Sequence, residues 1–317
     1  MRVFPVVIVL SAVGAPLTAQ TECGAQGYSG SAGRACQAFV DAAKQFHPLA
    51  GMIVSGGNPV LGTGETLRGV GHLSVSARVN MIKVSVPNPD SASRTSVPSS
   101  FSGLLPAPVV EGALGLIQGG RTGFLSVDAL ASAALLPTSG VSDLSVDPGA
   151  ARVGQVALGL GYGVRVGVFH GAFGVPAVSV SIMRRHLPRL QYGDVTAGDS
   201  VQFSTDLGAT NIRAVASLRV TFLELAGGVG WDHYSSKAEV AFLDPTRPLT
   251  NPQRIPLDLR NSREVLFLDA GLDLATAKLV GELGYQTGKD QHLTTNFTGF
   301  DPKAGHVFGG LGLRFTF

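Results

Sequence analysis

Apolar and polar residues alternate at a spacing of two along most of the chain after residue 66. From Val156 to Val168 one parity is apolar without interruption, while the other carries alanine, glycine and Arg165. An ordinary soluble strand has ~5–6 residues, whereas a tilted transmembrane strand needs ~9–11. The pattern therefore predicts strands that cross a membrane, with the apolar parity facing lipid and the polar parity facing a lumen.

The same parity rule assigns the charged residues of the other strand-like segments to the lumen. The predicted lumen-facing polar residues are Arg78, Glu111, Asp128, Arg165, Arg213, Arg219, Asp232, Asp269, Asp273, Lys278, Glu282 and Arg314. A selective pore tends to present a ring of one sign, but these charges are mixed. Two interpretations stay open: an internal ion-pair network that braces a narrow barrel, or a path that guides a solute.

The last strand has a distinctive composition. Leu311, Leu313, Phe315 and Phe317 share one face, and the other face carries glycine, Arg314 and threonine. A final aromatic residue after such a strand resembles the terminal signal of bacterial outer-membrane β-barrels. The resemblance implies that Leu313, Phe315 and Phe317 form an assembly signal for the barrel-assembly machinery, with the carboxyl end at the periplasmic interface.

Short and long connections take turns between the predicted strands. Short ones fall near 119–122, 171–174, 222–224 and 275–276, and long polar ones fall at 87–103, 137–151, 188–208, 235–261 and 289–304. Outer-membrane barrels have short periplasmic turns and longer external loops. We therefore predict an all-β fold: a transmembrane antiparallel up-and-down β-barrel of about 10–12 strands over residues 66–317, preceded by a short helical segment.

The amino-terminal residues predict export. Arg2 precedes an apolar run over residues 3–10, which is shorter than the ~20 residues of a transmembrane helix, and small residues lead to Ala19. We interpret residues 1–19 as a signal peptide cleaved after Ala19. No lipobox precedes Cys23, so no lipid anchor is expected. Together with the strands, this predicts the bacterial outer membrane as the location and its lipid as a partner.

Residues 20–65 differ from the rest and are predicted to form a plug segment. Residues 33–46 are rich in alanine and read as a short helix that ends before Pro48, with Phe39 and Phe46 on its apolar face. The stripe Gly159, Gly161 and Gly163 leaves a shallow inner wall against which this helix could lie. Cys23 and Cys36 are expected to form a disulfide in an oxidising compartment.

Composition narrows the classes of function. Glycine accounts for 42 of 317 residues, charged residues for 15%, and the mean hydropathy is +0.27. A soluble chain is typically ~25% charged. The net charge of +2 gives no reason to expect nucleic acid as a partner. Two cysteines alone do not make a structural zinc site, and we expect neither a metal nor a cofactor.

We find no motif that predicts catalysis, and we expect that the protein is not an enzyme. Asp232 and His233 resemble an omptin pair, but adjacent strand residues point to opposite faces. The histidines are scattered singly. The aromatic residues read as members of the interfacial girdles are Tyr162, Trp231, Tyr234 and Tyr285.

Residues 30–80 resemble the FadL-type transporters of hydrophobic molecules, which carry an amino-terminal hatch with an Asn-Pro motif near it. The match consists of the short segment, Asn58-Pro59 and a long first strand. The expected function is a channel or transporter for an unknown small solute, which the resemblance implies is hydrophobic. The first alternative is a structural or surface-interaction barrel without transport, and the second is an outer-membrane enzyme.

Overall fold

The computed structural model describes residues 22–87, 96–120, 122–137, 144–172, 174–199, 201–243, 252–274, 276–299 and 301–317. Within these ranges the helices are α1 (Glu22–Ala25) and α2 (Gly30–Ser55). The strands are β1 (Leu73–Pro87), β2 (Ser96–Ile117), β3 (Val127–Pro137), β4 (Leu144–Val146), β5 (Arg152–Val153), β6 (Val156–Phe169), β7 (Ala177–Tyr192), β8 (Val201–Val220), β9 (Leu223–Phe242), β10 (Gln253–Asp273), β11 (Lys278–Gln286), β12 (Asn296–Thr298) and β13 (His306–Thr316). The predicted signal peptide lies outside the described residues.

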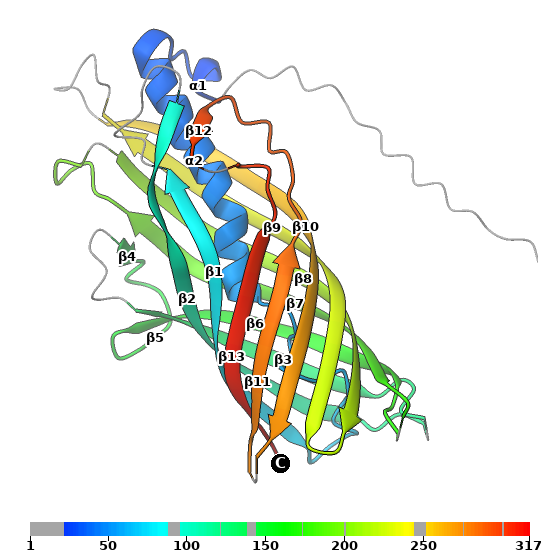
Figure 1. The fold of residues 1–317 in the computed structure, drawn as a ribbon. Coiled ribbons are helices and arrows are strands. Elements are labelled where there is room, and N and C mark those ends of the chain that lie inside the picture. The colour runs from blue at the N-terminus through cyan, green and yellow to red at the C-terminus, as the bar shows by residue number, and fades with distance from the viewer. Residues whose placement is uncertain are drawn as a thin grey trace, which may run out of the picture.

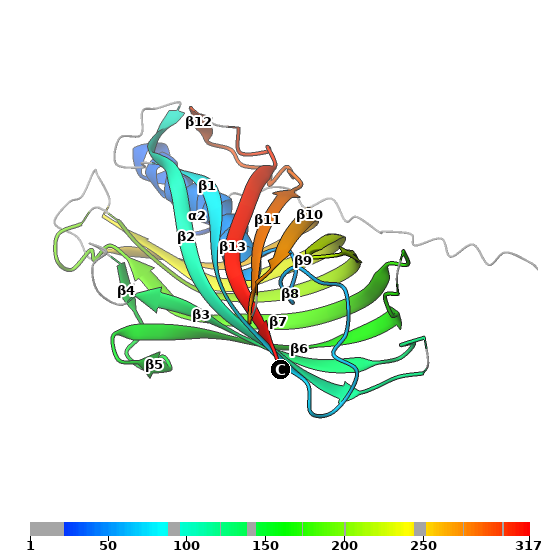
Figure 2. The same cartoon turned by 60° about the horizontal axis from the view of Figure 1, so that its bottom comes forward.

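Ten of these strands close into an antiparallel barrel around α2 (Figures 1 and 2). The order runs β7-β8-β9-β10-β11-β13-β1-β2-β3-β6, and β6 pairs with β7 to complete the circle. β1 pairs with the last strand from Ser74 to Ile82, and two further backbone bonds join Leu73 to Phe317, at 3.1 and 2.8 Å. The predicted fold class and strand number are confirmed.

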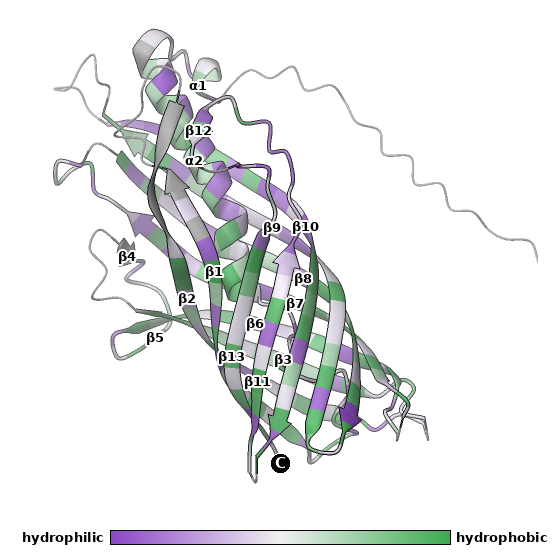
Figure 3. Ribbon diagram, in the orientation of Figure 1, coloured by the Kyte–Doolittle hydropathy of each residue, from purple (hydrophilic) through white to green (hydrophobic). Residues whose placement is uncertain are grey.

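The lower part of the barrel is apolar outside and polar inside. On β6, Leu160 and Tyr162 are 52% and 70% exposed, whereas Arg165 is 2% exposed. Figure 3 shows hydrophobic and hydrophilic residues alternating along the strands in this region. This is the reverse of a soluble protein and matches the predicted lipid-facing and lumen-facing parities.

The sidedness reverses toward the other end of the barrel. On the outward face of β10, Arg254, Asp258, Arg260 and Glu264 give way to apolar residues from Leu266 onward. On the inward face of the charged part lie the buried residues Ile255, Leu257 and Leu259. From Arg254 to Arg260 the strand therefore has an apolar inward face and a polar outward face, as in a soluble barrel. From Leu266 to Leu272 its outward face is apolar, and this identifies the part of the strand that contacts lipid.

Two predicted long loops are wrong in this respect. Within them, residues 235–242 and 253–261 are the ends of β9 and β10, and residues 188–192 and 201–208 are the ends of β7 and β8. These ends are polar outside because they stand in water, and their inward residues are covered by the plug segment rather than by lipid.

The helix is also longer than predicted, because α2 continues through Pro48 to Ser55. A proline inside a helix removes one hydrogen bond and costs ~3 kcal/mol. Burial of Leu49, Met52 and Ile53 against the barrel wall offsets that cost. Across the described ranges, neither helix is long and apolar enough to cross a membrane.

Candidate functional site in the barrel lumen

The plug segment, residues 22–65, runs down the lumen from one end of the barrel to the other. Its helix occupies the upper part, where Figure 2 shows the strands surrounding it. The lower half of α2 is mostly hydrophobic in Figure 3. It packs on inward-facing residues of the wall, among them Ile82, Val109, Leu187, Leu207, Phe267 and Phe308. The lumen is therefore filled at this level by protein.

The upper end of the segment is tied down by covalent, apolar and ionic contacts. Cys23 and Cys36 form the expected disulfide. Phe39 lies 5.8 Å from Phe242 between ring centroids, and Phe46 is only half-buried. Partial burial raises the pKa of the Glu22 carboxyl, but the hydrogen bond and charge of Lys44 outweigh it and leave the pKa below its usual value. The resulting ion pair, 2.5 Å long, fastens α1 to α2.

Gly56 ends the helix because it adopts a positive φ of 60°. The chain then turns so that its backbone amides point at the wall. Gly57 N and Asn58 N donate to the two oxygens of Glu282, at 2.9 and 2.7 Å. Gly62 N donates to Asp269 at 3.0 Å, and the Asn58 side chain donates to the same oxygen at 2.7 Å. Asp269 and Glu282, opposite each other on β10 and β11, thus hold residues 57–62.

Guanidinium groups surround the same turn from the other side. Arg213 donates to Gly57 O at 2.8 Å and to Gly56 O at 3.0 Å, and also pairs with Asp232 at 2.5 Å. Arg78 donates to Asn58 O at 3.1 Å. The helix end is therefore held through both its amides and its carbonyls.

Arg78 also links this turn to a second carboxylate. It pairs with Glu111 at 3.0 Å and with Glu282 at 3.4 Å, and Arg185 pairs with Glu111 at 3.0 Å. All of these side chains are almost completely buried. We call this set the lumen charge layer: Arg78, Glu111, Arg185, Arg213, Asp232, Asp269 and Glu282. It contains four carboxylates and three guanidiniums. Plug amides donate to Glu282 and Asp269, and the wall residues Asn211 and Tyr234 donate to Asp232.

A second group of charges lies nearer the end that carries Phe317. Arg165 pairs with Asp128 at 2.7 Å, and Leu67 N donates to Asp128 at 3.1 Å. Glu224 pairs with Lys278, with Arg314 at 3.2 Å and with Arg219 at 3.4 Å.

The structure places ten of the twelve predicted lumen residues in the buried interior, and two at its rim. Arg219 and Asp273 are the two, with side chains 55% and 35% exposed, respectively. Sequence reasoning missed Arg185 and Glu224. Arg185 shares the parity of Ser179 and Ser181, and Glu224 shares that of Asp232, so the pattern contained both signals.

Tyr234 is not a girdle residue, so that prediction is wrong. It is 0% exposed, its hydroxyl donates to Asp232 at 2.7 Å, and Gln286 donates to that hydroxyl at 3.0 Å. Its parity is that of Asp232, which faces inward. The three other aromatic residues, Tyr162, Trp231 and Tyr285, are exposed on the outer wall.

The glycines that let the plug segment approach the barrel wall closely are mostly those of the plug segment itself, not the predicted stripe. A Cβ at Gly57 would lie 2.7 Å from the ring of Phe267, and one at Gly64 would lie 2.8 Å from Val215 O. A Cβ at Gly51 would overlap the ring of Tyr234. At Gly159, Gly161 and Gly163 the nearest atoms belong to neighbouring strands.

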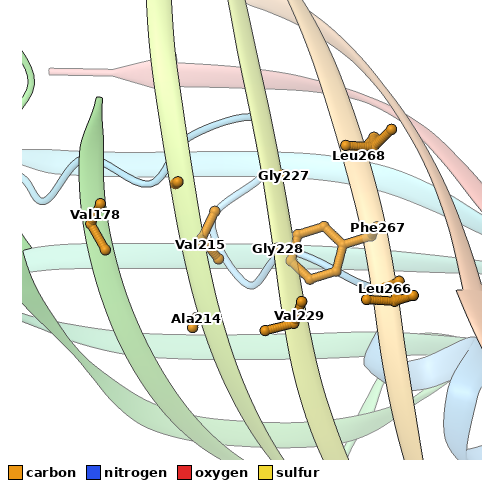
Figure 4. A pocket seen from close by; sticks show the side chains of 10 residues that line it. Val178, Ala214, Val215, Gly227, Gly228, Val229, Leu266, Phe267 and Leu268 are labelled. Atoms are coloured by element: carbon orange, nitrogen blue, oxygen red, sulfur yellow. The ribbon is translucent and has the colours of Figure 1, made fainter. Parts of the chain in front are cut away.

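Two cavities lie near these elements. One, of about 520 Å³, opens at the end that carries Phe317 and is lined by both plug and wall residues, including Val60, Thr63, Arg219, Lys278 and Arg314. The other is an apolar depression of about 410 Å³ beside Gly227, Gly228, Leu266 and Leu268 (Figure 4). The ring of Phe267 covers Gly228 there, and the lumen charge layer contributes no side chain to its lining.

Comparisons with known proteins give a fold likeness and no family. No family model matches the chain, and no curated protein matches it. The translocator domain of the autotransporter NalP from Neisseria meningitidis is 12% identical with a TM-score of 0.43, over 88% of this chain and 97% of that one. The Pseudomonas putida toluene transporter TodX is 11% identical with a TM-score of 0.32, over 81% and 96%. Ail, the attachment invasion locus protein of Yersinia pestis, is 11% identical with a TM-score of 0.29, over 78% and 99%.

The assignment of class rests on the strand pairing and the outward apolar belt. The chain is a transmembrane β-barrel of the kind found in the outer membrane of Gram-negative bacteria. Its lumen contains its own amino-terminal segment.

Proposed function

We propose that the protein passes a small solute across the outer membrane and that the plug segment closes the lumen until part of it moves. The observation that supports this is the kind of contact that holds residues 56–65. These residues are fixed largely by hydrogen bonds to Glu282, Asp269 and Arg213. Hydrogen bonds to charged groups contribute ~1.5–3 kcal/mol each, so they can be exchanged one at a time for bonds to water that enters the lumen.

The residues that line the 520 Å³ cavity indicate the polarity of the proposed solute. Its lining combines apolar residues such as Val60 and Leu67 with charged residues of both signs, namely Glu65, Arg68, Arg219, Asp273, Lys278 and Arg314. A solute with an apolar body and a polar group suits this lining better than a pure hydrocarbon.

Planar-bilayer conductance of the refolded protein tests the proposal. We expect low conductance from the intact chain and higher conductance after removal of residues 22–60. Mass spectrometry of the purified protein should detect a co-purified small molecule. Unchanged conductance in the truncated chain, with no bound molecule, would contradict transport.

A second candidate function is surface interaction without transport. The polar outer extensions of β9 and β10, with Lys237, Arg254 and Asp258 on their outward faces, favour it. This candidate function predicts no conductance from the intact protein or from the protein without residues 22–60. It also predicts that the outer extensions, and not the lumen charge layer, are sensitive to substitution.

We also propose that Asp232 and His233 have no joint catalytic role. Asp232 is buried in the lumen, whereas the His233 ring stacks on Trp231 with centroids 5.7 Å apart. Unchanged conductance and binding in a His233→Gln variant would agree with this. Loss of a hydrolytic activity in that variant would contradict it.

A further inference from the structure

The direction in which the plug segment runs through the barrel is fixed by its contacts. At its start, the Tyr28 hydroxyl donates to Gln253 at 2.6 Å, next to the end of β9. At its finish, the chain reaches Leu73, which pairs with Phe317. The segment therefore begins at one mouth of the barrel and ends at the opposite mouth, as Figure 1 shows.

The lengths of the connections identify which mouth is outside. Thr221–Phe222 joins β8 to β9 and residues 274–277 join β10 to β11, both at the mouth of Phe317. The longest connection between barrel strands, residues 287–305, lies at the other mouth, as does the connection over residues 243–252. Short turns are periplasmic and long loops are external in barrels of this kind.

The reversal of sidedness supports the same orientation independently of loop length. The strand ends around Tyr28 have charged outward faces, so they project from the lipid into water. The lipid-contacting part of the strands lies toward Phe317. Glu22 is therefore on the outer side, well beyond the level at which β10 leaves the lipid.

We propose that the barrel carries its own amino-terminal segment outward through its lumen and keeps it there, with Glu22 displayed at the cell surface. The expected signal peptide delivers the chain to the periplasmic side, so residues 22–55 have to cross in order to reach their observed place. This activity is separate from solute passage and does not depend on it.

The charges of the segment agree with this route. Its Asp, Glu, Lys and Arg residues between 22 and 55 are Glu22, Arg34, Asp41 and Lys44. All four belong to the outer half, and residues 45–55, which lie against the apolar inner wall, contain none. Asp41 then secures the segment outside, because its carboxylate accepts bonds from Thr294 N and Thr295 N in the loop after β11, at 3.0 and 2.9 Å.

An epitope inserted between Thr21 and Glu22 of the full chain tests the proposal in intact cells. We expect antibody labelling of intact cells with no further gain on permeabilisation. The same epitope between Thr276 and Ala277 should be labelled only after permeabilisation, and one after Gly299 should be labelled in both conditions. Labelling of the Glu22 epitope only after permeabilisation, with the Gly299 control still labelled on intact cells, would overturn the proposal.

Insertion of the epitope between Gly27 and Tyr28, in the exposed turn between α1 and α2, is the second variant if the first fails to assemble. The expected and contradicting results are the same. Neither result depends on conductance, so failure of this proposal and failure of solute passage are distinguishable.

Discussion

The side-chain amide of Asn58 donates a hydrogen bond to Asp269, 2.7 Å away, and thereby joins the plug segment to the barrel wall. Asn58 also donates to Thr63 O and accepts from Val60 N, so it shapes the turn that it anchors. One amide thus couples the conformation of the loop to its attachment. This is the physical role that the structure gives to the Asn of Asn58-Pro59.

Replacing Asp269 by alanine should loosen the plug. Asn58 Nδ2 and Gly62 N lose their shared acceptor, and each unpaired buried donor costs ~1–3 kcal/mol. We expect a lower midpoint in urea unfolding and faster proteolysis of residues 56–65. Asp258→Ala on the same strand is the control, since the ion pair it breaks with Arg260 is solvent-exposed. Equal behaviour of the two variants would contradict the anchoring role.

Gly51→Ala should be destabilising although alanine favours helices by ~1 kcal/mol. The new Cβ overlaps the ring of Tyr234, which is fully buried and cannot move freely. Overpacking of this kind costs ~1–3 kcal/mol. The unfolding free energy of Gly51→Ala, Tyr234→Leu and the double variant should be measured. We expect the double variant to lose less than the sum of the two.

Gly281→Ala is the matched control for that cycle, because a Cβ there meets no atom within 4 Å. Strict additivity of Gly51→Ala and Tyr234→Leu would show that the helix does not press on Tyr234.

Depth along β10 should decide how arginine is tolerated. Leu268 and Asp258 share the outward parity of one strand, but Leu268 faces lipid and Asp258 faces water. Leu268→Arg should cost ~2–4 kcal/mol if the site is near the midplane, as measured for arginine in other barrels. Asp258→Arg should change the folding titration little. Similar effects at both positions would refute the boundary drawn between Glu264 and Leu266.

The final residue should matter for assembly. Deleting Phe317 removes both backbone bonds to Leu73, where the first strand meets the last. We expect a smaller heat-modifiable fraction in detergent gels and less protein in the outer membrane. Phe222→Asp, at an exposed turn of the same mouth, should assemble normally. Normal assembly of the truncated chain would show that Phe317 is not an assembly signal.

Alternation revealed the strands but left one ambiguity. A period of two shows that the two faces of a strand differ. The period is the same whether the apolar face points outward to lipid or inward to a buried helix. On β10 the inward Leu257 and the outward Leu268 belong to opposite parities of one strand, and only depth in the membrane separates them. The sequence pattern therefore predicts loops where the structure has the outer strand ends.

Strand parity was enough to predict which side chains face the lumen, but not which residues they bind there. Asp269 and Glu282 could be assigned to the interior from spacing. Their binding to Gly57 N, Asn58 and Gly62 N could not, because those contacts join residues more than two hundred positions apart. The length of α2 was missed for a similar reason: burial outweighs the local penalty of Pro48.

The disulfide between Cys23 and Cys36 makes the outer end of the plug segment wider than the rest of it. It clamps α1 against α2, so the outer end of the segment is two helices wide, each ~10 Å across with side chains. The passage below holds a single helix. We therefore expect the bridge to form only after the segment has crossed the lumen, and then to hinder its withdrawal toward the periplasm while leaving residues 56–65 free to rearrange. In that case a single covalent bond beyond the lipid-contacting part restrains the plug in one direction only.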